Sequence, residues 1–582
     1  MDNNVALIAQ CEAKAKQWLT PDFDETTRKA VQAMLDNADK TELVESFYRD
    51  LEFGTGGLRG IMGAGTNRMN IYTVGMATQG FANYLKKNFK DRKQISTVVC
   101  YDCRNNSDLY ARTVANIFSA NGIKVYLFDE MRPTPECSFA IRHFGAQGGV
   151  NLTASHNPRE YNGYKAYWED GAQVLAPHDK GIIDEVGKVT IADVKFEGNN
   201  DLIQMVGADV DAPYLEQIKT ICIDPEVIRH QHDLKIVYTP LHGAGRMLIP
   251  QSLKYWGFDN VHCVAEQMVK NGNFPTVDRP NPEFAEALTL GLRDAKQLDA
   301  DILMASDPDA DRVGMACKND KGEWVLINGN QTCLIFLWYI ITNRQAVGKM
   351  KPTDFIVKTI VTTEVIREIA EKNHIEMRDC YTGFKWIARE IKLSEGKQQY
   401  IGGGEESYGF LAEDFVRDKD AVSACSLLAE ICAYAKDHGK TLYDILMDIY
   451  KEYGYSKEFT INVERPGKTG AEEIQQMMTD FRANPPKELA GVPVCLWKDY
   501  KTLEATQADG TKTQLVMPET SNVLQWFCTD GTKVSVRPSG TEPKIKFYLE
   551  VKDTLKEAAD FAACEARAEQ KIEAIKASLN LD

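Results

Sequence analysis

Short apolar runs alternate with helical stretches along most of this chain, and this alternation restricts its fold more than any other feature of the sequence. Runs such as QISTVVCYDC, IKVYLFD and ADILMAS have the length and composition of buried strands. Stretches such as DLYARTVANIFSANG and TTEVIREIAEKNH have the periodicity of helices. Strand–helix alternation at this spacing predicts an α/β fold with mixed, mostly parallel sheets.

The charge balance narrows the classes of partner. Lys+Arg 68 against Asp+Glu 84 leaves a formal net charge of −16. Nucleic acids and anionic membranes require a net positive surface, so we expect no nucleic-acid and no membrane partner. A phosphorylated small molecule is not excluded, because it needs only a locally positive pocket.

Cysteine usage and the apolar runs predict a cytoplasmic protein. The 14 cysteines are scattered without CxxC spacing, which is typical of reduced thiols. The N-terminal stretch MDNNVALIAQCEAKAKQWL contains acids and no uninterrupted apolar region, so it does not resemble a signal peptide. The longest apolar run, Cys333 to Ile341, is far below the roughly 18 residues that span a bilayer.

One loop carries three acids at alternate positions. In SDPDADRVG, the residues Asp307, Asp309 and Asp311 follow an apolar strand directly. Three carboxylates this close repel one another unless a cation lies among them, and Mg²⁺ favours such oxygen ligands. A calcium loop would need glycine at position six, where Arg312 stands. The alternative is a solvated acidic turn, which the strict alternation after a strand makes less favourable.

A second loop, TASHNP, places a serine and a histidine at the end of another strand. Ser155 could be a nucleophile or a phosphoryl carrier, or simply a cap or turn residue. His156 could transfer protons or be a packed structural histidine. Pro158 keeps Asn157 extended and so defines the turn. Lys165 follows closely, although a single lysine is most often a surface residue.

Two further loops are informative only in combination with these. In GGGEESYGF the glycines let backbone approach a ligand, and Glu405 and Ser407 could bind sugar hydroxyls; the alternative is a flexible hairpin with exposed acids. RPSGTEPKIK has the donors of a phosphate cradle, or else is a β-hairpin turn. No GxxxxGK[ST] occurs, and GTGGLR lacks the third glycine of the dinucleotide fingerprint, so no motif supports nucleotide-dependent transfer.

Taken in order, TASHNP, DPDADR, GEESYG and RPSGTEP resemble the motifs of the α-D-phosphohexomutase superfamily, the phosphoglucomutases and phosphomannomutases. They run from Ser155 to Lys544 and so cover most of the chain. FGTGGLRG, NGNFPTVDRPNPE and YTGFKWI add to the resemblance. The length and the GFKW and DKDAVSA stretches are most similar to the longer branch, which includes phosphoglucomutase and phosphopentomutase members.

The resemblance implies three related α/β domains and a smaller C-terminal α+β domain around one central cleft. Together with the sequence patterns, it predicts five segments. These are an N-terminal helical extension at 1–50, an α/β domain with the serine loop at 51–210, an α/β domain with the metal loop at 211–328, an α/β domain with the sugar-binding loop at 329–455, and an α+β phosphate-binding domain at 456–582.

The resemblance also assigns roles to residues. Ser155 would carry the phosphoryl group and, with Asp307, Asp309 and Asp311, would ligate one Mg²⁺ per chain. The residues that would bind the substrate or add positive charge are Arg59, Lys165, Arg312, Gly383, Phe384, Glu405, Ser407, Lys419, Arg537, Ser539, Gly540 and Thr541. Tyr408 and Gly409 follow the serine of the sugar loop, where dual-specificity bacterial members usually have Gly-His. The general base therefore stays open between His156 and Lys165.

The function that the resemblance implies is a phosphoglucomutase. Phospho-Ser155 would phosphorylate O6 of glucose 1-phosphate, and the resulting glucose 1,6-bisphosphate, the intermediate and activator, would reorient and return its other phosphate. Mannose and pentose phosphates are alternative substrates, and a sugar 1,6-bisphosphate synthase is a further alternative. A metal-dependent phosphatase and a non-catalytic sugar-phosphate sensor are the remaining ones. We expect a monomer or a homodimer.

Overall fold

The computed structural model describes residues 2–54, 56–465, 467–539 and 544–581. The chain begins with three helices, α1 (Asp2–Gln17), α2 (Glu25–Asp36) and α3 (Thr41–Phe47). Trp18 stacks on Phe23 and contacts Phe47 and Tyr72 edge-on, so an aromatic cluster joins these helices to the first sheet's α4 (Ile71–Asn88).

The first sheet has a parallel centre and an antiparallel edge. Its order is β1-β5-β4-β2-β3-β6, and β4, β2, β3 and β6 pair in parallel while β1, β5 and β4 pair antiparallel. Its strands are β1 (Gly57–Ile61), β2 (Ser96–Tyr101), β3 (Lys124–Phe128), β4 (Gly148–Leu152), β5 (Tyr161–Trp168) and β6 (Ile203–Val206). The other helices here are α5 (Ser107–Ala120), α6 (Thr134–Phe144) and α7 (His178–Val186). β1 lies in the glycine-rich stretch that begins FGTGGLRG, and its backbone pairs with β5.

The second sheet is similarly mixed, in the order β11-β10-β9-β7-β8. Its strands are β7 (Ile236–Thr239), β8 (Val261–Cys263), β9 (Ile302–Ser306), β10 (Val313–Lys318) and β11 (Trp324–Ile327). Its helices are α8 (Ala208–Lys219), α9 (Pro225–His230), α10 (Gly245–Trp256) and α11 (Thr289–Gln297).

The third sheet has the order β13-β12-β14-β15, with only its last pair antiparallel. Its strands are β12 (Asp354–Thr359), β13 (Glu376–Cys380), β14 (Gln399–Gly404) and β15 (Phe410–Ala412). Its helices are α12 (Gly329–Ala346), α13 (Val365–Lys372), α14 (Phe384–Ser394), α15 (Ala421–Asp437) and α16 (Leu442–Tyr453). The long apolar run lies inside α12, which is buried within the core; among the described residues, none of the helices has the length and apolarity needed to cross a membrane.

The C-terminal sheet is antiparallel throughout its described pairs. Its strands are β16 (Tyr455–Glu464), β17 (Glu488–Leu489), β18 (Val492–Asp499), β19 (Glu504–Gln507), β20 (Lys512–Gln514), β21 (Leu524–Cys528), β22 (Lys533–Pro538) and β23 (Lys544–Asp553). The helices α17 (Gly467–Ala483) and α18 (Phe561–Ser578) accompany it. The last helix, α18, begins at Phe561, after a short 3-10 turn at Ala558–Asp560.

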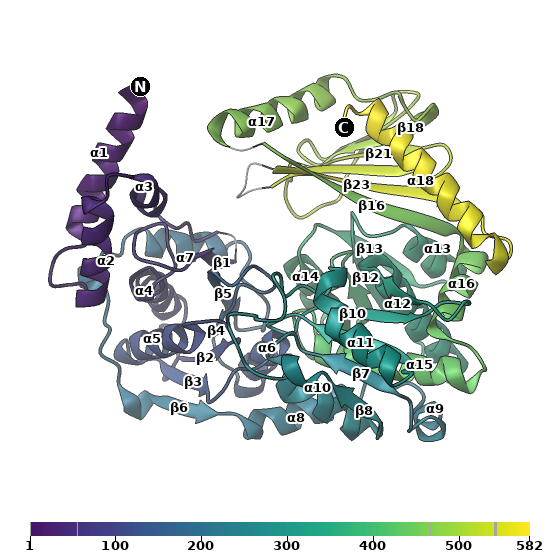
Figure 1. Cartoon of the computed structure of the whole chain (residues 1–582), viewed down its shortest axis with the longest axis horizontal. Coiled ribbons are helices and arrows are strands. Elements are labelled where there is room, and N and C mark those ends of the chain that lie inside the picture. Colours follow the sequence, from purple (N-terminus) through teal and green to yellow (C-terminus); the bar gives the residue numbers. More distant parts are fainter. Residues whose placement is uncertain (1, 55, 466, 540–543, 582) are drawn as a thin grey trace.

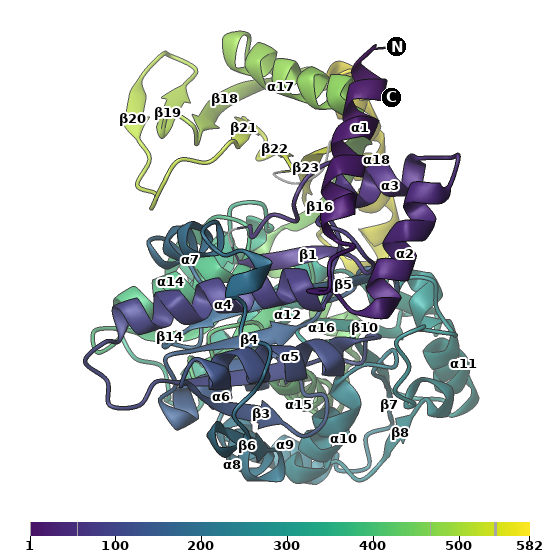
Figure 2. The ribbon, with the colours of Figure 1, turned by 90° about the vertical axis from the view of Figure 1, so that its left-hand side faces the viewer.

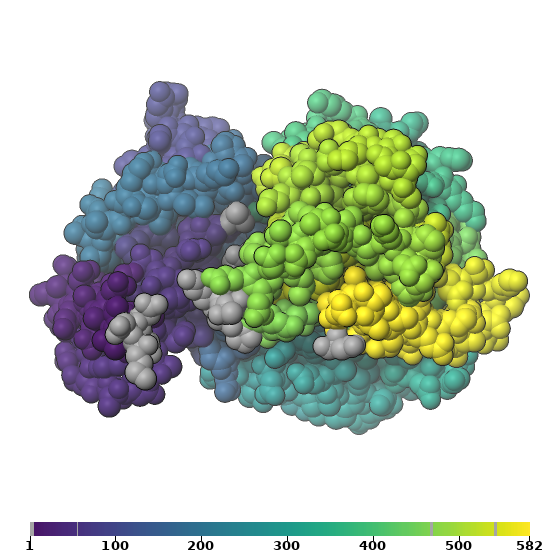
Figure 3. Space-filling model, turned by 90° about the horizontal axis from the view of Figure 1, so that it is seen from above, coloured from purple at the N-terminus to yellow at the C-terminus, as the bar shows by residue number. Residues whose placement is uncertain are grey.

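The arrangement confirms the predicted α/β class. The first sheet lies at the left of Figure 1, the second and third lie at the centre and right, and the C-terminal sheet lies above the third. Figure 2 shows the C-terminal sheet above the α/β layers from the side. One apolar cluster extends through the second, third and C-terminal sheets, whereas the first sheet has clusters of its own. Seen from above, the surface is hollowed between the N-terminal part and the C-terminal sheet (Figure 3).

Candidate active site

The serine loop leaves the centre of the first sheet at the carboxyl end of β4. Ser155 is 4% exposed and has a φ of 52°, in the left-handed region that non-glycine residues seldom adopt. Its backbone N–H donates to Thr153 Oγ1 at 2.8 Å, and Thr153 Oγ1 donates to Asp102 Oδ2 at 2.7 Å. Asp102 directly follows β2, so two adjacent strand ends hold the serine in this conformation.

Arg104 fastens the rest of the loop. Its Nη2 donates to the carbonyl oxygens of Ser155 at 2.7 Å and Asn157 at 2.5 Å, and its Nη1 donates to those of Pro158 at 2.8 Å and Tyr161 at 3.0 Å. The guanidinium is buried and pairs with Asp102 at 3.3 Å. One side chain therefore replaces the hydrogen bonds that an irregular buried backbone would otherwise lack.

The metal loop follows β9 in the second sheet. Asp307, Asp309 and Asp311 are 0%, 0% and 1% exposed, and one carboxylate oxygen from each lies within 4.8 Å of the others. Oδ1 of Asp309 and Oδ1 of Asp311 are buried and accept no hydrogen bond within the described chain. Buried carboxylate oxygens without donors fit a hard divalent cation, because oxygen-only ligand sets suit Mg²⁺. The solvated acidic turn is therefore excluded.

The two loops meet at the serine hydroxyl. Ser155 Oγ donates to Asp307 Oδ2 at 2.8 Å and lies 3.2 Å from His156 Nδ1. Burial, with Asp311 and Asp309 close by, raises the pKa of Asp307 well above its usual value. A cation among the three carboxylates would relieve this repulsion.

Two buried lysines contact the same carboxylates. Lys165 Nζ lies 2.7 Å from Asp309 Oδ2 and 3.1 Å from Asp311 Oδ2, and Lys419 Nζ lies 2.9 Å from Asp311 Oδ2. Burial alone would raise the pKa of Asp309 and Asp311, but Lys165 holds both below the usual range, aided at Asp311 by Lys419. Lys165, which would by itself be a surface lysine, is 8% exposed and part of the site.

Arginines and the histidine line the same junction. Arg312 Nη1 donates to Glu283 Oε1 at 2.7 Å, and Arg59, on β1, donates to Asn157 Oδ1 at 3.1 Å. Burial, together with the positive charges of Arg312 and Arg59, lowers the pKa of His156 well below its usual value. His156 is therefore a neutral imidazole at neutral pH.

The sugar loop joins β14 to β15 beside the metal loop. Arg312 and Gly409 form a β-bridge, and Val313 N donates to the carbonyl oxygen of Tyr408 at 3.1 Å. Glu405 is 5% exposed and its Oε1 accepts from Gly383 N at 2.8 Å. The segment is thus a hairpin, but Glu405 is buried rather than exposed as in the flexible alternative.

The remaining predicted residues lie nearby with different exposures. Ser407 is partly exposed, whereas the Phe384 side chain is 3% exposed and packs in the core at the start of α14. A role for Phe384 would therefore involve its backbone. Burial and the adjacent Glu405 raise the pKa of Glu406 to about 7.

The phosphate loop connects β22 to β23 in the C-terminal sheet. Arg537 lies at the end of β22, and Ser539 N donates to the carbonyl oxygen of Lys544 at 2.8 Å, as in a β-hairpin. Gly540 and Thr541, also predicted in this loop, lie outside the described residues. The positive charges of Lys546 and Arg537 act to lower the pKa of Glu406. Both side chains therefore lie near the sugar loop.

Sequence reasoning missed the residues that support the site. Thr134 N and Oγ1 donate to the carbonyl oxygen and Oδ2 of Asp309 at 2.8 and 2.7 Å. Asp102, Thr153 and Arg104 were not predicted either. The available signal was position, because Asp102 and Arg104 follow β2 just as Ser155 follows β4.

Sequence models of a known family match most of the chain. The α/β/α domains I, II and III of phosphoglucomutase/phosphomannomutase match residues 50–192, 212–322 and 328–453, and the C-terminal domain matches residues 461–568. The chain belongs to the phosphoglucomutase/phosphomannomutase family. It is therefore an isomerase of the intramolecular phosphotransferase type, and the predicted resemblance is confirmed.

Curated relatives cover nearly the whole chain. A phosphoglucomutase of Staphylococcus haemolyticus is 34% identical over 525 residues, 89% of this chain and 93% of the relative. A Staphylococcus aureus phosphoglucomutase is 36% identical over 513 residues, 87% of this chain and 91% of its own. The human phosphopentomutase is 34% identical over 565 residues, 93% of this chain and 92% of its own.

Solved structures share the fold. A phosphoglucomutase/phosphomannomutase family protein from Burkholderia thailandensis has a TM-score of 0.64 at 18% identity, covering 91% of this chain and 97% of its own. Parafusin from Paramecium, in an open form, has a TM-score of 0.65 at 18% identity, covering 90% of this chain and 94% of its own.

Proposed function

We propose that this family member is a phosphoglucomutase that interconverts glucose 1-phosphate and glucose 6-phosphate through phospho-Ser155 and glucose 1,6-bisphosphate. The observation that carries the proposal is the junction where Ser155 Oγ meets Asp307 at 2.8 Å amid two further buried carboxylates. The similarity to staphylococcal phosphoglucomutases at 34% and 36% identity supports this choice of sugar.

The residues at the junction would have different roles in phosphoryl transfer. Mg²⁺, one per chain and held by Ser155, Asp307, Asp309 and Asp311, would neutralise charge on the transferring phosphoryl group. Arg312 and Arg59 would add positive charge beside it. Lys165 and Lys419 already pair with the carboxylates, at 2.7 to 3.1 Å, and would stay protonated there.

In the forward step, the O6 hydroxyl of glucose 1-phosphate attacks the phosphorus of phospho-Ser155. The O6–P bond forms as the P–Oγ bond breaks, and the O6 proton passes to a base while Ser155 Oγ leaves. In the second half, Ser155 Oγ attacks the phosphorus of the 1-phosphate of the reoriented bisphosphate. The Oγ–P bond forms as the O1–P bond breaks, and the proton held by the base passes to O1, so glucose 6-phosphate leaves and phosphoserine is regenerated. Glu405 and Ser407, with Gly383 and Phe384 beside them, would orient the sugar. Arg537, Ser539, Gly540 and Thr541 would hold the phosphate that does not react.

The geometry favours His156 over Lys165 as the base. His156 Nδ1 is 3.2 Å from Ser155 Oγ, within hydrogen-bond reach of the atom that gains and loses the phosphoryl group. Lys165 is a poor acceptor, because two carboxylates hold its ammonium group.

A second candidate substrate is a pentose phosphate. The human phosphopentomutase is as similar, at 34% identity over 93% of the chain, as the first staphylococcal relative. Mannose phosphates and sugar 1,6-bisphosphate synthesis remain alternatives with the same serine and metal loop. We infer a cytoplasmic enzyme, monomeric or homodimeric.

The test is phosphorus NMR of the purified protein with glucose 1-phosphate, Mg²⁺ and a trace of glucose 1,6-bisphosphate. We expect a growing glucose 6-phosphate signal without inorganic phosphate. Faster conversion of ribose or mannose 1-phosphate would transfer the assignment to that sugar. Inorganic phosphate would indicate a phosphatase, accumulating bisphosphate a synthase, and no change with any sugar a sensor.

A further inference from the structure

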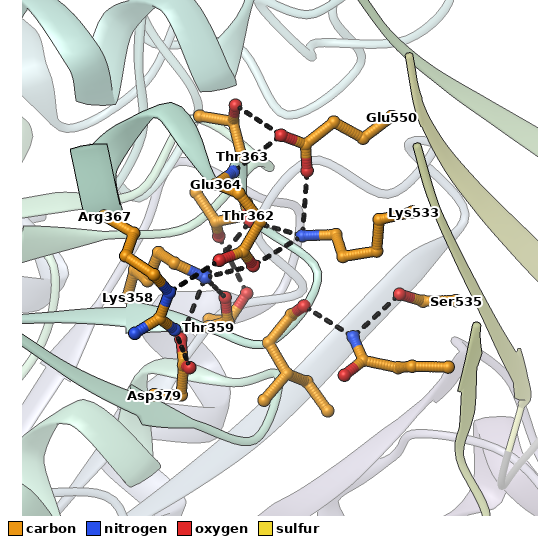
Figure 4. Close-up of polar contacts among 12 residues, drawn as sticks. Lys358, Thr359, Thr362, Thr363, Glu364, Arg367, Asp379, Lys533, Ser535 and Glu550 are labelled. Carbon is orange, nitrogen blue, oxygen red and sulfur yellow. Dashed lines mark hydrogen bonds and ion pairs between the residues drawn. The ribbon is translucent and has the colours of Figure 1, made fainter. Parts of the chain in front are cut away.

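A buried ion cluster joins the third sheet to the C-terminal sheet (Figure 4). Lys533 Nζ lies 2.9 Å from Glu364 Oε1 and 2.9 Å from Glu550 Oε2, and donates to the carbonyl oxygen of Thr362 at 3.0 Å. The side chains of Lys533 and Glu550 are only 1% and 3% exposed. The ammonium group thus donates hydrogen bonds to Glu364 and to the Thr362 carbonyl, and it pairs by charge with Glu550.

Glu364 links the two sides of the cluster. Its Oε1 also accepts from Lys358 Nζ at 2.9 Å, and its backbone N donates to Glu550 Oε1 at 2.7 Å. Burial would raise the pKa of Glu364, but Lys358 and Lys533 outweigh it and hold that pKa well below its usual value. Glu364 is therefore charged at neutral pH.

Each side of the cluster continues into a substrate loop. Lys358, on β12, is the register partner of Gly404, the residue before Glu405 of the sugar loop. Lys533 begins β22, and Arg537 lies four residues further along the strand, about 13 Å away on the same face. Between them Gln525 Nε2 donates to Ser535 Oγ at 2.8 Å and to the carbonyl oxygen of Ile360 at 2.7 Å.

We propose that Lys533, Glu364 and Glu550 are positioning residues that set where the phosphate-binding hairpin stands relative to the sugar loop. The inference rests on the proposed mutase function, because only there must one sugar reach both loops at once. A sugar phosphate of set length can contact Glu405 and Arg537 together only at one separation of the two sheets. The unreacting phosphate is bound in the ground state and in the transition state alike, so a displaced hairpin raises KM more than it lowers kcat. A misplacement of about 1 Å can cost roughly 100-fold.

A matched pair of variants tests this. Lys533→Met removes the buried ammonium group. Lys552→Met removes a partly exposed one that also joins β23 to α13, through an ion pair with Glu368 at 3.0 Å. We expect Lys533→Met to raise KM for glucose 1-phosphate by between about 10-fold and about 100-fold with a smaller change in kcat. Lys552→Met should leave both constants unchanged.

A double variant separates positioning from stability. Lys533→Met with Glu550→Gln removes opposite buried charges together, so it avoids leaving one unpaired. We expect this variant to recover thermal stability but to keep the raised KM. A normal KM in either folded variant, or an equal rise in Lys552→Met, would overturn the proposal.

Hydrogen exchange provides an arm that is independent of activity. We expect Lys533→Met to accelerate exchange in peptides covering residues 358–367 and 533–538, and Lys552→Met not to. If the wild-type protein isomerises none of the sugar phosphates, the proposed function fails while this measurement still decides whether the cluster holds the hairpin. Unchanged hydrogen exchange in Lys533→Met would reject the proposal that the cluster positions the hairpin.

Discussion

At the scale of single residues, the site depends on groups that hold the serine as much as on the serine itself. Ser155 has a φ of 52° and is held through Thr153, Asp102 and Arg104. A strained backbone persists only where its surroundings enforce it.

Arg104→Met should disorder the serine loop, because four carbonyl oxygens lose their donor and buried Asp102 loses its partner. We expect the free energy of unfolding to fall by about 3–5 kcal/mol and activity by about 100-fold. Thermal unfolding and the mutase assay measure both. The control is Arg159→Met, because Arg159 lies in the same loop but its side chain is 63% exposed. Equal effects of the two substitutions would contradict the role of Arg104 in holding the loop.

Ser155→Ala should lower turnover by orders of magnitude and leave the fold intact, because a loop hydroxyl carries little stability. Mass spectrometry after incubation with glucose 1,6-bisphosphate should show phosphorylation of the wild type alone. An alanine variant of near-normal activity would reject the carrier role.

Asp309→Asn should weaken Mg²⁺ binding, because one of the two unbonded buried carboxylate oxygens is lost as a charged ligand. Calorimetric Mg²⁺ titration and the Mg²⁺ dependence of activity should both shift to higher concentration. Asp320→Asn, on an exposed turn, should shift neither. An unmoved curve for Asp309→Asn would mean that the ion binds elsewhere.

At the scale of secondary-structure elements, each proposed loop is the end of a strand. Pairing of β16 with β23 has a further consequence, because it places Glu458 directly opposite Glu550. Burial and the like charge of Glu550 raise the pKa of Glu458 to about 7. Glu458 lines a small cavity together with Glu406, Lys533 and Glu550.

This pair predicts a pH dependence of stability. A carboxyl whose pKa is raised on folding binds its proton more tightly in the folded state, so its contribution is complete below its usual pKa near 4.5 and is lost as the pH rises through about 7. We therefore expect the thermal midpoint to fall between pH 5 and about 8, and Glu458→Gln to flatten that fall. Identical pH profiles of the two proteins would refute the assignment.

At the scale of the whole molecule, the site lies at a junction between the first and second sheets, and contacts such as Arg417 N to Ser138 Oγ and Lys270 to Glu130 join the first sheet to the rest elsewhere. Ser155 and Thr134 reach Asp307 and Asp309 across this junction, whereas the other three sheets share one apolar cluster. Ligands that bind at the junction should therefore stabilise the assembly of domains as well as their own loops.

Mg²⁺ with glucose 1,6-bisphosphate should raise the thermal midpoint. At a ligand concentration one hundred times the dissociation constant, the free energy of unfolding should increase by about 2.7 kcal/mol. Ser155→Ala should keep most of this shift, since it still binds, and Asp309→Asn should lose the part due to Mg²⁺. Scanning fluorimetry measures all three. No shift in the wild type would contradict binding between the domains.

The sequence by itself indicated strands such as β2, β3 and β9, and the loops that carry Ser155, Asp307, Glu405 and Arg537. Periodicity and strand-end composition are local, so they are readable without a fold. Glycine-rich backbone was the exception, because β1 forms only by pairing with β5.

Only the tertiary structure decided which of these residues act together. Lys165 and Asp309 are 144 residues apart in sequence, Thr134 and Asp309 are 175 apart, and Lys533 and Glu364 are 169 apart. No local pattern marks Lys165, Thr134 or the pair of Lys533 and Glu364 as such partners, since each of these residues alone would be an ordinary surface or turn residue. Burial makes these pairings necessary, because a charged group removed from water is costly unless it pairs with a group of opposite charge. The packing of the sheets determines which groups form each pair.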